Sequence, residues 1–165
     1  MLHDNLREDQ IPVFISHRTA DDNVALRVHD RLTRVHGISC YIDNLDRQTK
    51  DSAITELIVS RIRECTNLLA LMTPNTKGSW WVPFEIGVAR EAPRIITSYT
   101  NLDMTDLPEY LKEWPVLTGD RAVDTFAEHY KRGAALVKRA FLESRTAGEA
   151  NVQQFHRQLK ASLGQ

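Results

Sequence analysis

Short apolar runs alternate along the chain with longer segments whose apolar residues recur at helical spacing, and this alternation restricts the possible folds. Strands are predicted at 11–16, 38–43, 67–72, 94–99 and 114–117. The third of these runs is apolar from Leu68 to Met72, which is typical of a strand covered on both faces. Strands that alternate with helices form βαβ units and so give a parallel sheet with helices on both faces. We therefore expect an α/β fold around a parallel sheet of about five strands.

The intervening segments carry apolar residues at the spacing of one helix face. They predict helices at 23–35, 52–65, 79–92, 107–112, 123–141 and 151–163, after a polar lead-in at 1–10. Gly37 is expected to end the first helix. Thr146, Ala147 and Gly148 are expected to separate the last two helices within a C-terminal helical extension at 143–165. The apolar face of that extension fits packing on the domain or on a partner.

The overall composition excludes several classes of protein. The 165 residues carry a net charge of −1, whereas nucleic-acid-binding proteins usually show a clear basic excess. No window approaches the ~18 apolar residues of a membrane span, and the polar start lacks the apolar core of a signal peptide. Cys40 and Cys65 lie in apolar elements, which favours buried thiols in a reducing compartment over a disulfide or a metal pair. The six histidines show no metal spacing, and we expect a soluble, cytoplasmic protein without a metal.

Three polar segments follow strands of the predicted sheet. Ser16-His17-Arg18 follows the first strand, 43–46 follows the second, and a loop that begins at Thr73 follows the third. The carboxyl ends of parallel strands lie at one edge of a sheet, which is where ligands bind in such folds. The three segments therefore converge in space, and the third leads directly into a helix that carries a glutamate.

The helix predicted at 79–92 combines an indole with a carboxylate. Ser79 is its expected cap, and Pro83 suits the first turn, where the missing N–H of proline costs nothing. Trp81 and Glu85 stand four residues apart and so lie on the same face of the helix. Glu85 is then either an edge residue that reaches solvent or a carboxylate held in a pocket, and the converging segments favour the pocket.

Several familiar site chemistries lack their motifs in this chain. No Gly-x-Gly-x-x-Gly follows the first strand and no Gly-Lys-Ser/Thr element is present, which argues against nucleotide-dependent redox chemistry and P-loop hydrolysis. A receiver domain needs paired acids after its first strand and an aspartate after its third, where this chain has Ser16-His17 and Thr73-Pro74. A serine hydrolase of the α/β type would need a Gly-x-Ser-x-Gly elbow, which is also missing.

The segment Val13-Phe14-Ile15-Ser16-His17-Arg18 resembles the first sequence box of TIR (Toll/interleukin-1 receptor) domains. Trp81-x-x-x-Glu85 resembles the motif of their catalytically active members. The similarity covers 11–142 and implies a three-layer, flavodoxin-like fold with five strands. The chain is most similar to bacterial stand-alone TIR proteins of antiphage defence. Those proteins use NAD⁺ as a substrate, release nicotinamide and leave ADP-ribose or a cyclic or conjugated ADP-ribose signal.

The resemblance also implies which residues form the site. Glu85 would be the catalytic carboxylate, Trp81 would shield its pocket, and Arg18 would meet the pyrophosphate of the substrate. The expected substrate-binding residues are Phe14, Ser16, Arg18, Asp43, Asp46 and Trp81.

The loop that contains Asp43 and Asp46 departs from the family. In TIR domains this loop gates the pocket and contacts a neighbouring protomer, and it often holds an Arg-Asp-x-x-Pro-Gly-like turn. The segment 43–52 has neither proline nor glycine, which puts the usual contacts of the loop in doubt and leaves the argument for Glu85 unchanged. Asp43 also fits a turn former, and Asp46 also fits a solvated loop charge.

Simpler alternatives exist for the residues of the first box. Phe14 lies inside a strand and also fits plain core. His17 fits a solvated loop residue as well as a base. Arg18 fits an ion pair with a nearby aspartate, Asp21 or Asp22, as well as a contact with substrate.

We expect an NAD⁺ glycohydrolase or cyclase that takes NAD⁺ as substrate, needs no cofactor and self-associates through TIR–TIR contacts. Its product would be sensed by a downstream effector. Two alternatives stay open, namely a non-catalytic TIR scaffold and an enzyme like the nucleoside deoxyribosyltransferases, which have a similar fold and a glutamate nucleophile. A scaffold has no need of a carboxylate beside Trp81.

Trp80, the neighbouring residue, fits packing or an interface anchor.

Overall fold

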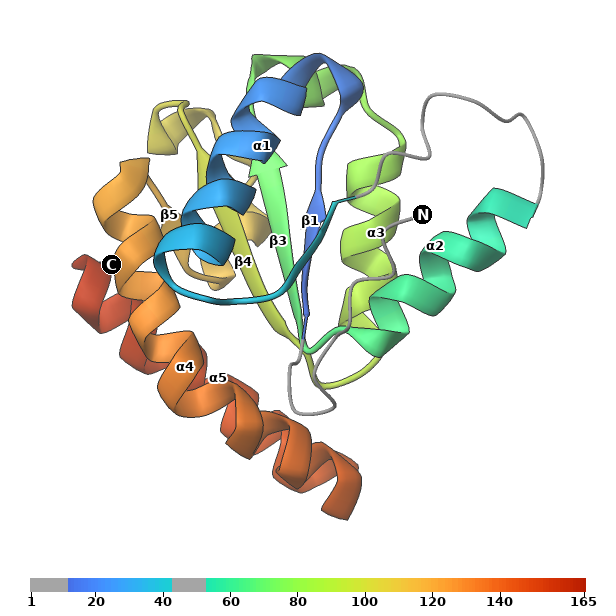
Figure 1. Ribbon diagram of the computed structural model, residues 1–165, viewed down its shortest axis with the longest axis vertical. Helices are drawn as coiled ribbons and strands as arrows, with labels where there is room; N and C mark the ends of the chain where they lie inside the picture. The colour runs from blue at the N-terminus through green and yellow to red at the C-terminus, as the bar shows by residue number, and fades with distance from the viewer. Residues whose placement is uncertain (1–11, 43–52) are drawn as a thin grey trace.

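The computed structural model describes residues 12–42 and 53–165, and its middle layer is a five-stranded sheet (Figure 1). The strands are β1 (Val13–Ser16), β2 (Cys40–Ile42), β3 (Asn67–Met72), β4 (Ile95–Thr100) and β5 (Val116–Leu117). Neighbouring strands pair in parallel in the order β2-β1-β3-β4-β5. This is the flavodoxin-like order, in which the direction of winding reverses between β1 and β3. Each strand overlaps its predicted range, and the predicted α/β fold is confirmed.

Helices cover both faces of the sheet, so the fold has three layers (Figure 1). α1 (Asp22–Asp30), α4 (Gly119–Glu143) and α5 (Arg145–Leu163) pack on one face, and α2 (Ala53–Glu64) and α3 (Trp81–Arg90) pack on the other. Side chains alternate between the two faces along a strand. Val13 and Ile15 accordingly join the core beneath the first group of helices, and Phe14 joins the core beneath the second. Ser16 therefore faces α3.

Short helical turns shape the connections between the main elements. They are η1 (Thr19–Asp21), η2 (Arg31–Val35), η4 (Pro74–Gly78), η5 (Met104–Asp106) and η6 (Glu109–Glu113). η2 is a π-helical continuation of α1, and Gly37 then takes a left-handed φ of 67°, which confirms the predicted end of that helix. The helix predicted at 107–112 is the 3₁₀ turn η6, and η4 lies where only a loop was expected.

The boundary between the last two helices differs from the prediction. Ser144 is extended, and its hydroxyl accepts a hydrogen bond of 3.1 Å from the N–H of Ala147, so Ser144 caps α5. Thr146, Ala147 and Gly148 therefore lie in the first turns of α5 and do not separate it from α4. The sequence expectation gave too much weight to the low helix propensity of one glycine, which costs only about 1 kcal/mol relative to alanine.

α5 covers the edge of the sheet formed by β4 and β5. The N–H of Ile96 in β4 donates a hydrogen bond of 3.0 Å to Nε2 of His156 in α5. At the short strand β5, the side-chain amide of Gln165 pairs with both the N–H and the carbonyl of Val116. These contacts supply hydrogen bonds that a further strand would otherwise make, and they leave less of the edge open to pairing.

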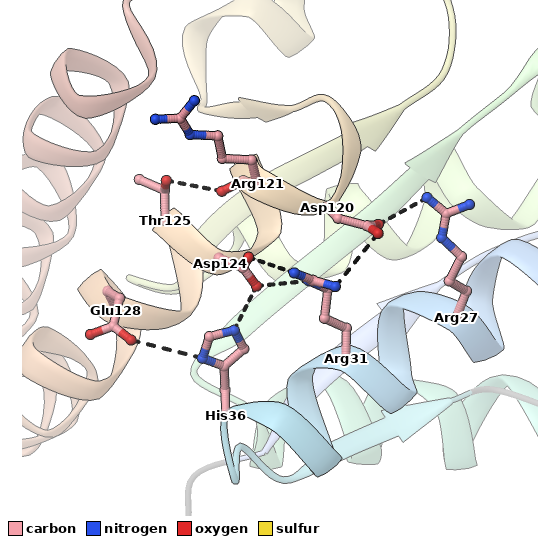
Figure 2. Close-up of polar contacts among 8 residues, drawn as sticks. All are labelled: Arg27, Arg31, His36, Asp120, Arg121, Asp124, Thr125 and Glu128. Atoms are coloured by element: carbon pink, nitrogen blue, oxygen red, sulfur yellow. Dashed lines mark hydrogen bonds and ion pairs between the residues drawn. The ribbon is translucent and has the colours of Figure 1, made fainter.

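A polar network joins η2 to α4 (Figure 2). Arg31 donates hydrogen bonds of 2.7 and 2.6 Å to the two carboxylate oxygens of Asp124, and Nε2 of His36 lies 2.7 Å from the same carboxylate. The hydrogen bonds from Arg31, with a smaller contribution from His36, lower the pKa of Asp124 to about 2. Nδ1 of His36 also lies 3.8 Å from Glu128. The network fixes α4 against the helix that follows the end of β1.

Both cysteines are free thiols, and the predicted burial is confirmed in full only for Cys65. Cys65 is buried and Cys40 is half-buried. Burial raises the pKa of each thiol to about 12, so very little reactive thiolate forms at neutral pH.

Within 12–42 and 53–165, no helix has the length and apolar character needed to cross a membrane. The same residues contain no group of three or more His, Cys, Asp or Glu side chains placed to hold a metal ion.

Candidate active site

The carboxyl ends of β1 and β3 place the first and third of the predicted polar segments side by side, whereas the second, 43–46, lies outside the described residues. Ser16 is the last residue of β1, and Thr73 comes directly after β3. These two strands are neighbours in the sheet, with Ser16 in register with Ala70. The loop after β3 continues through η4 into α3, so Glu85 approaches the same edge from the face of the sheet that α3 covers.

Glu85 and Ser16 form the centre of the site. Ser16 is fully buried, and its hydroxyl donates a hydrogen bond to Oε2 of Glu85. The Glu85 residue is 2% exposed, so the alternative of an edge residue that reaches solvent is wrong. A buried carboxylate is costly unless hydrogen-bond donors satisfy it. The contact therefore requires the end of β1 and the middle of α3 to be held in fixed positions.

The local sequence explains where α3 begins. The helix starts at Trp81 rather than at the predicted Ser79, and the Ser79 hydroxyl accepts a hydrogen bond of 3.3 Å from the N–H of Val82. Pro83 lies in the first turn, as expected, where no helical hydrogen bond needs its N–H. The helix then buries Val82, Glu85, Ile86 and Ala89 on one face.

The two tryptophans at the start of α3, Trp80 before it and Trp81 within it, have different environments. Trp81 is half-buried, packs against the core between α3 and the sheet, and meets Phe84 edge-on with ring centroids 5.8 Å apart. Its predicted role of shielding the pocket of Glu85 stays a prediction. Trp80 is 91% exposed, so the packing alternative for this residue is wrong and the interface alternative remains.

Phe14 lies deeper in the fold than Ser16. Its side chain is fully buried, and its ring centroid lies 5.4 Å from that of Tyr41 on β2. It belongs to the core that supports the end of β1, as the simpler alternative for this residue states. Its predicted contact with substrate stays a prediction.

Arg18 extends over the loop after β3. Its Nη1 donates a hydrogen bond of 2.6 Å to the main-chain carbonyl of Asn75. The alternative ion pair with Asp21 or Asp22 is not formed, because Asp21 bonds to Thr73 and Asn75 and Asp22 bonds to His17. Arg18 is exposed, so its guanidinium is accessible from solvent beside the segments that carry Ser16 and Glu85.

His17 is a buried residue of the loop after β1. It is 7% exposed, and its Nε2 lies 2.9 Å from a carboxylate oxygen of Asp22 at the start of α1. The alternative of a solvated loop residue is therefore wrong. Asp43 and Asp46, the remaining predicted site residues, lie outside the described residues.

The residues that connect the two loops were not among the predicted site residues. Asp21 is 4% exposed and accepts hydrogen bonds of 2.6 Å from the Thr73 hydroxyl and 2.8 Å from the Asn75 amide. The Thr73 hydroxyl also accepts from the N–H of Asn75 and so caps η4. Threonine followed by proline is a recognised start signal for a helical turn, and this signal was present in Thr73-Pro74.

The fold and this site define an α/β protein of flavodoxin-like order with a buried carboxylate at the carboxyl edge of its sheet. Residues 13–125 match the family model described as the TIR domain. This match spans more than half of the chain, which therefore belongs to the TIR domain family.

A search of curated proteins finds no match. Among solved structures, the chain is similar to a 2-desoxiribosyltransferase from Leishmania mexicana, with 18% sequence identity and a TM-score of 0.46. That alignment covers 56% of this chain and 65% of the other.

Proposed function

We propose that this TIR domain cleaves the bond between nicotinamide and ribose in NAD⁺. The observation that carries the proposal is the buried carboxylate of Glu85, which accepts a hydrogen bond from Ser16 at the edge of the sheet where ligands bind. A purely structural glutamate would more often lie on the exposed face of α3.

A single carboxylate is enough for this reaction. In NAD⁺ the nicotinamide nitrogen is already cationic, so the C–N bond breaks with its electron pair going to a neutral leaving group. An ordinary glycosidase needs a second carboxyl group to protonate its leaving group, and here that need is absent. Glu85 would bind the ribose hydroxyls and stabilise the positive charge that develops on the ribose carbon.

The fate of the ribosyl cation decides the product. Attack by water, with loss of a proton, gives ADP-ribose, whereas attack by a second nucleophile gives a cyclic or conjugated ADP-ribose. Trp81 would help to keep water out, and exclusion of water also strengthens the interaction between Glu85 and the cation. Phe14 and Ser16 would line the pocket, Arg18 would bind the pyrophosphate, and Asp43 and Asp46 would belong to the loop that closes over the substrate.

The proposal extends to assembly and context. The enzyme would self-associate through TIR–TIR contacts, with a neighbouring protomer completing the site, and its product would signal to an effector in bacterial antiphage immunity. Activity per protomer should then rise with protein concentration, and a rate that stays flat over a wide concentration range would contradict this part of the proposal.

The direct test of the reaction is mass spectrometry of the products after incubation with NAD⁺. The proposal predicts free nicotinamide together with ADP-ribose, a cyclic isomer or a conjugate. A protein that leaves NAD⁺ intact at every concentration would contradict the proposal and favour the scaffold unless it exchanges bases. A parallel incubation with a deoxynucleoside and a free base separates a third possibility, because base exchange there would identify a deoxyribosyltransferase.

A further inference from the structure

Arg18 contacts the loop after β3. Its Nη1 donates a hydrogen bond of 2.6 Å to the carbonyl of Asn75. It also fills the space above Gly78, because a Cβ on Gly78 would lie 3.1 Å from the same nitrogen. A Cβ at position 78 would therefore require the guanidinium to shift by a few tenths of an ångström, which disturbs its contact with the loop.

The loop that holds Arg18 is itself fixed by a buried carboxylate. Asp21 accepts hydrogen bonds from the Asn75 amide at 2.8 Å and from the Thr73 hydroxyl at 2.6 Å. The N–H of Asn75 donates to that same hydroxyl at 3.1 Å. Asn75 is thus fixed through its main chain and its side chain, and its carbonyl presents a defined acceptor to Arg18.

The charge of Arg18 is not neutralised within the described part of the chain. Its hydrogen bond there goes to an uncharged carbonyl, and no carboxylate of residues 12–42 or 53–165 forms an ion pair with it. The guanidinium has further N–H donors arranged to bind two oxygens of a phosphate group at once. Because Arg18 is exposed, those donors are accessible to an anion from solvent.

The same two segments supply both halves of the site. β1 and its loop carry Ser16 and then Arg18, and the chain from η4 into α3 carries Gly78 and then Glu85. Ser16 bonds to Glu85, and Arg18 packs on Gly78. The cation and the buried carboxylate are therefore carried by the same two segments, which suits a substrate that has both a phosphate group and a reactive sugar.

We propose that Asp21, Asn75 and Gly78 are positioning residues that hold Arg18 for a diphosphate group, so that the site selects dinucleotides over nucleosides without phosphate. This inference rests on the proposed function, in which the reactive ribose lies at Glu85. It adds the residues that make Arg18 a selective contact and names the class of substrate that they favour.

The test compares two substrates with the same scissile bond, NAD⁺ and nicotinamide riboside, which has no phosphate. Arg18→Met should lower kcat/KM for NAD⁺ about tenfold or more, mainly through KM, because a charged hydrogen-bonded contact is lost. Gly78→Ala and Asn75→Ala should have effects of the same kind but about threefold in size, because they displace Arg18 without removing it. The kcat/KM for nicotinamide riboside should change less than about twofold in each variant. Arg18→Lys should lose less kcat/KM for NAD⁺ than Arg18→Met does.

Gly87→Ala is the matched control. Gly87 also lies in the segment that leads to and forms α3, but a Cβ there would meet no atom within 4 Å. This variant should keep the ratio of the two kcat/KM values of the wild type. Equal losses for both substrates in Arg18→Met and Gly78→Ala would overturn the inference, because a general structural defect does not distinguish them.

Binding of ADP-ribose and adenosine, measured by calorimetry, separates this inference from the proposed reaction. The wild type should bind ADP-ribose more tightly than adenosine, and Arg18→Met should remove most of that difference. If NAD⁺ is not cleaved but this pattern holds, the proposed function fails and the selection for a diphosphate stands. If the wild type shows no preference for ADP-ribose, or if Arg18→Met keeps the preference, the inference is wrong.

Discussion

The hydroxyl of Ser16 and the carboxylate of Glu85 come from residues that are far apart in the chain and meet only because β1 and α3 pack together. A buried carboxylate without hydrogen-bond donors would destabilise the fold, so the hydroxyl of Ser16 both satisfies the carboxylate and fixes its direction. At the scale of single residues, the proposed chemistry depends on this contact more than on any other.

Ser16→Ala should therefore lower kcat/KM for NAD⁺ by about tenfold to a hundredfold, because a hydrogen bond to a charged group contributes roughly 1.5–3 kcal/mol. Steady-state release of nicotinamide measures the effect. Ser98→Ala is the matched control, because Ser98 is a fully buried serine of β4 whose hydroxyl has no hydrogen-bond partner among the described residues. Similar losses in both variants would show that Ser16 acts only through the stability of the sheet.

At the scale of elements, α5 is attached to the sheet by a histidine that must stay neutral. Nε2 of His156 accepts the hydrogen bond of the Ile96 N–H, which an imidazolium could not do. Burial, followed by the charges of Lys160 and Arg90, lowers the pKa of His156 from 6.5 to about 4. The attachment of α5 should therefore weaken in acid.

The direction of the pH effect on stability follows from the protonation of His156 in the folded and in the unfolded chain. Above pH 6.5 the imidazole is neutral in both the folded and the unfolded chain, and as the pH falls toward 4 only the unfolded chain takes up the proton. His156 should contribute a loss of about 3 kcal/mol in the free energy of unfolding across this window. Urea unfolding at several pH values measures it. His156→Phe should be less stable at neutral pH but should lose less stability on acidification, and equal slopes for the two proteins would contradict this account.

The elements were predictable from the sequence where one periodicity dominates. The apolar run of β3 indicates a buried strand and the amphipathic pattern of α4 indicates a helix, so the types and approximate positions of both elements follow from the sequence. Gly148 predicts a break before α5, but the cap from Ser144 outweighs it, so α5 begins earlier than predicted. The link from Asp21 to Asn75 could not be predicted, because it joins two loops whose relative position depends on the sheet.

At the scale of the whole molecule, the candidate site and the contacts of α5 and Gln165 with β4 and β5 lie in different parts of the sheet. Ser16 and Glu85 meet at the carboxyl end of β1, whereas His156 and Gln165 contact β4 and β5. Changes in α5 should therefore alter stability more than chemistry. Trp80 directly precedes α3 and is exposed to solvent, and there the proposed assembly would meet the proposed chemistry.

Trp80→Ala should leave the free energy of unfolding within about 0.5 kcal/mol of the wild type, since the side chain is 91% exposed. If Trp80 anchors an interface, the same variant should weaken self-association, which analytical ultracentrifugation can measure, and should lower activity per protomer at high concentration. Unchanged self-association would remove Trp80 from the interface and leave the site at Glu85 unaffected.

The most direct test of the central claim is the rate of nicotinamide release from NAD⁺ by the Glu85→Gln variant. Gln has nearly the same shape as Glu but no charge, so the account predicts a loss of at least about a hundredfold in kcat with the fold intact by circular dichroism. Glu109→Gln makes the same chemical change at a side chain that is 89% exposed, and it should behave as the wild type. Release by Glu85→Gln at the rate of the wild type would contradict the assignment of Glu85 as the catalytic carboxylate.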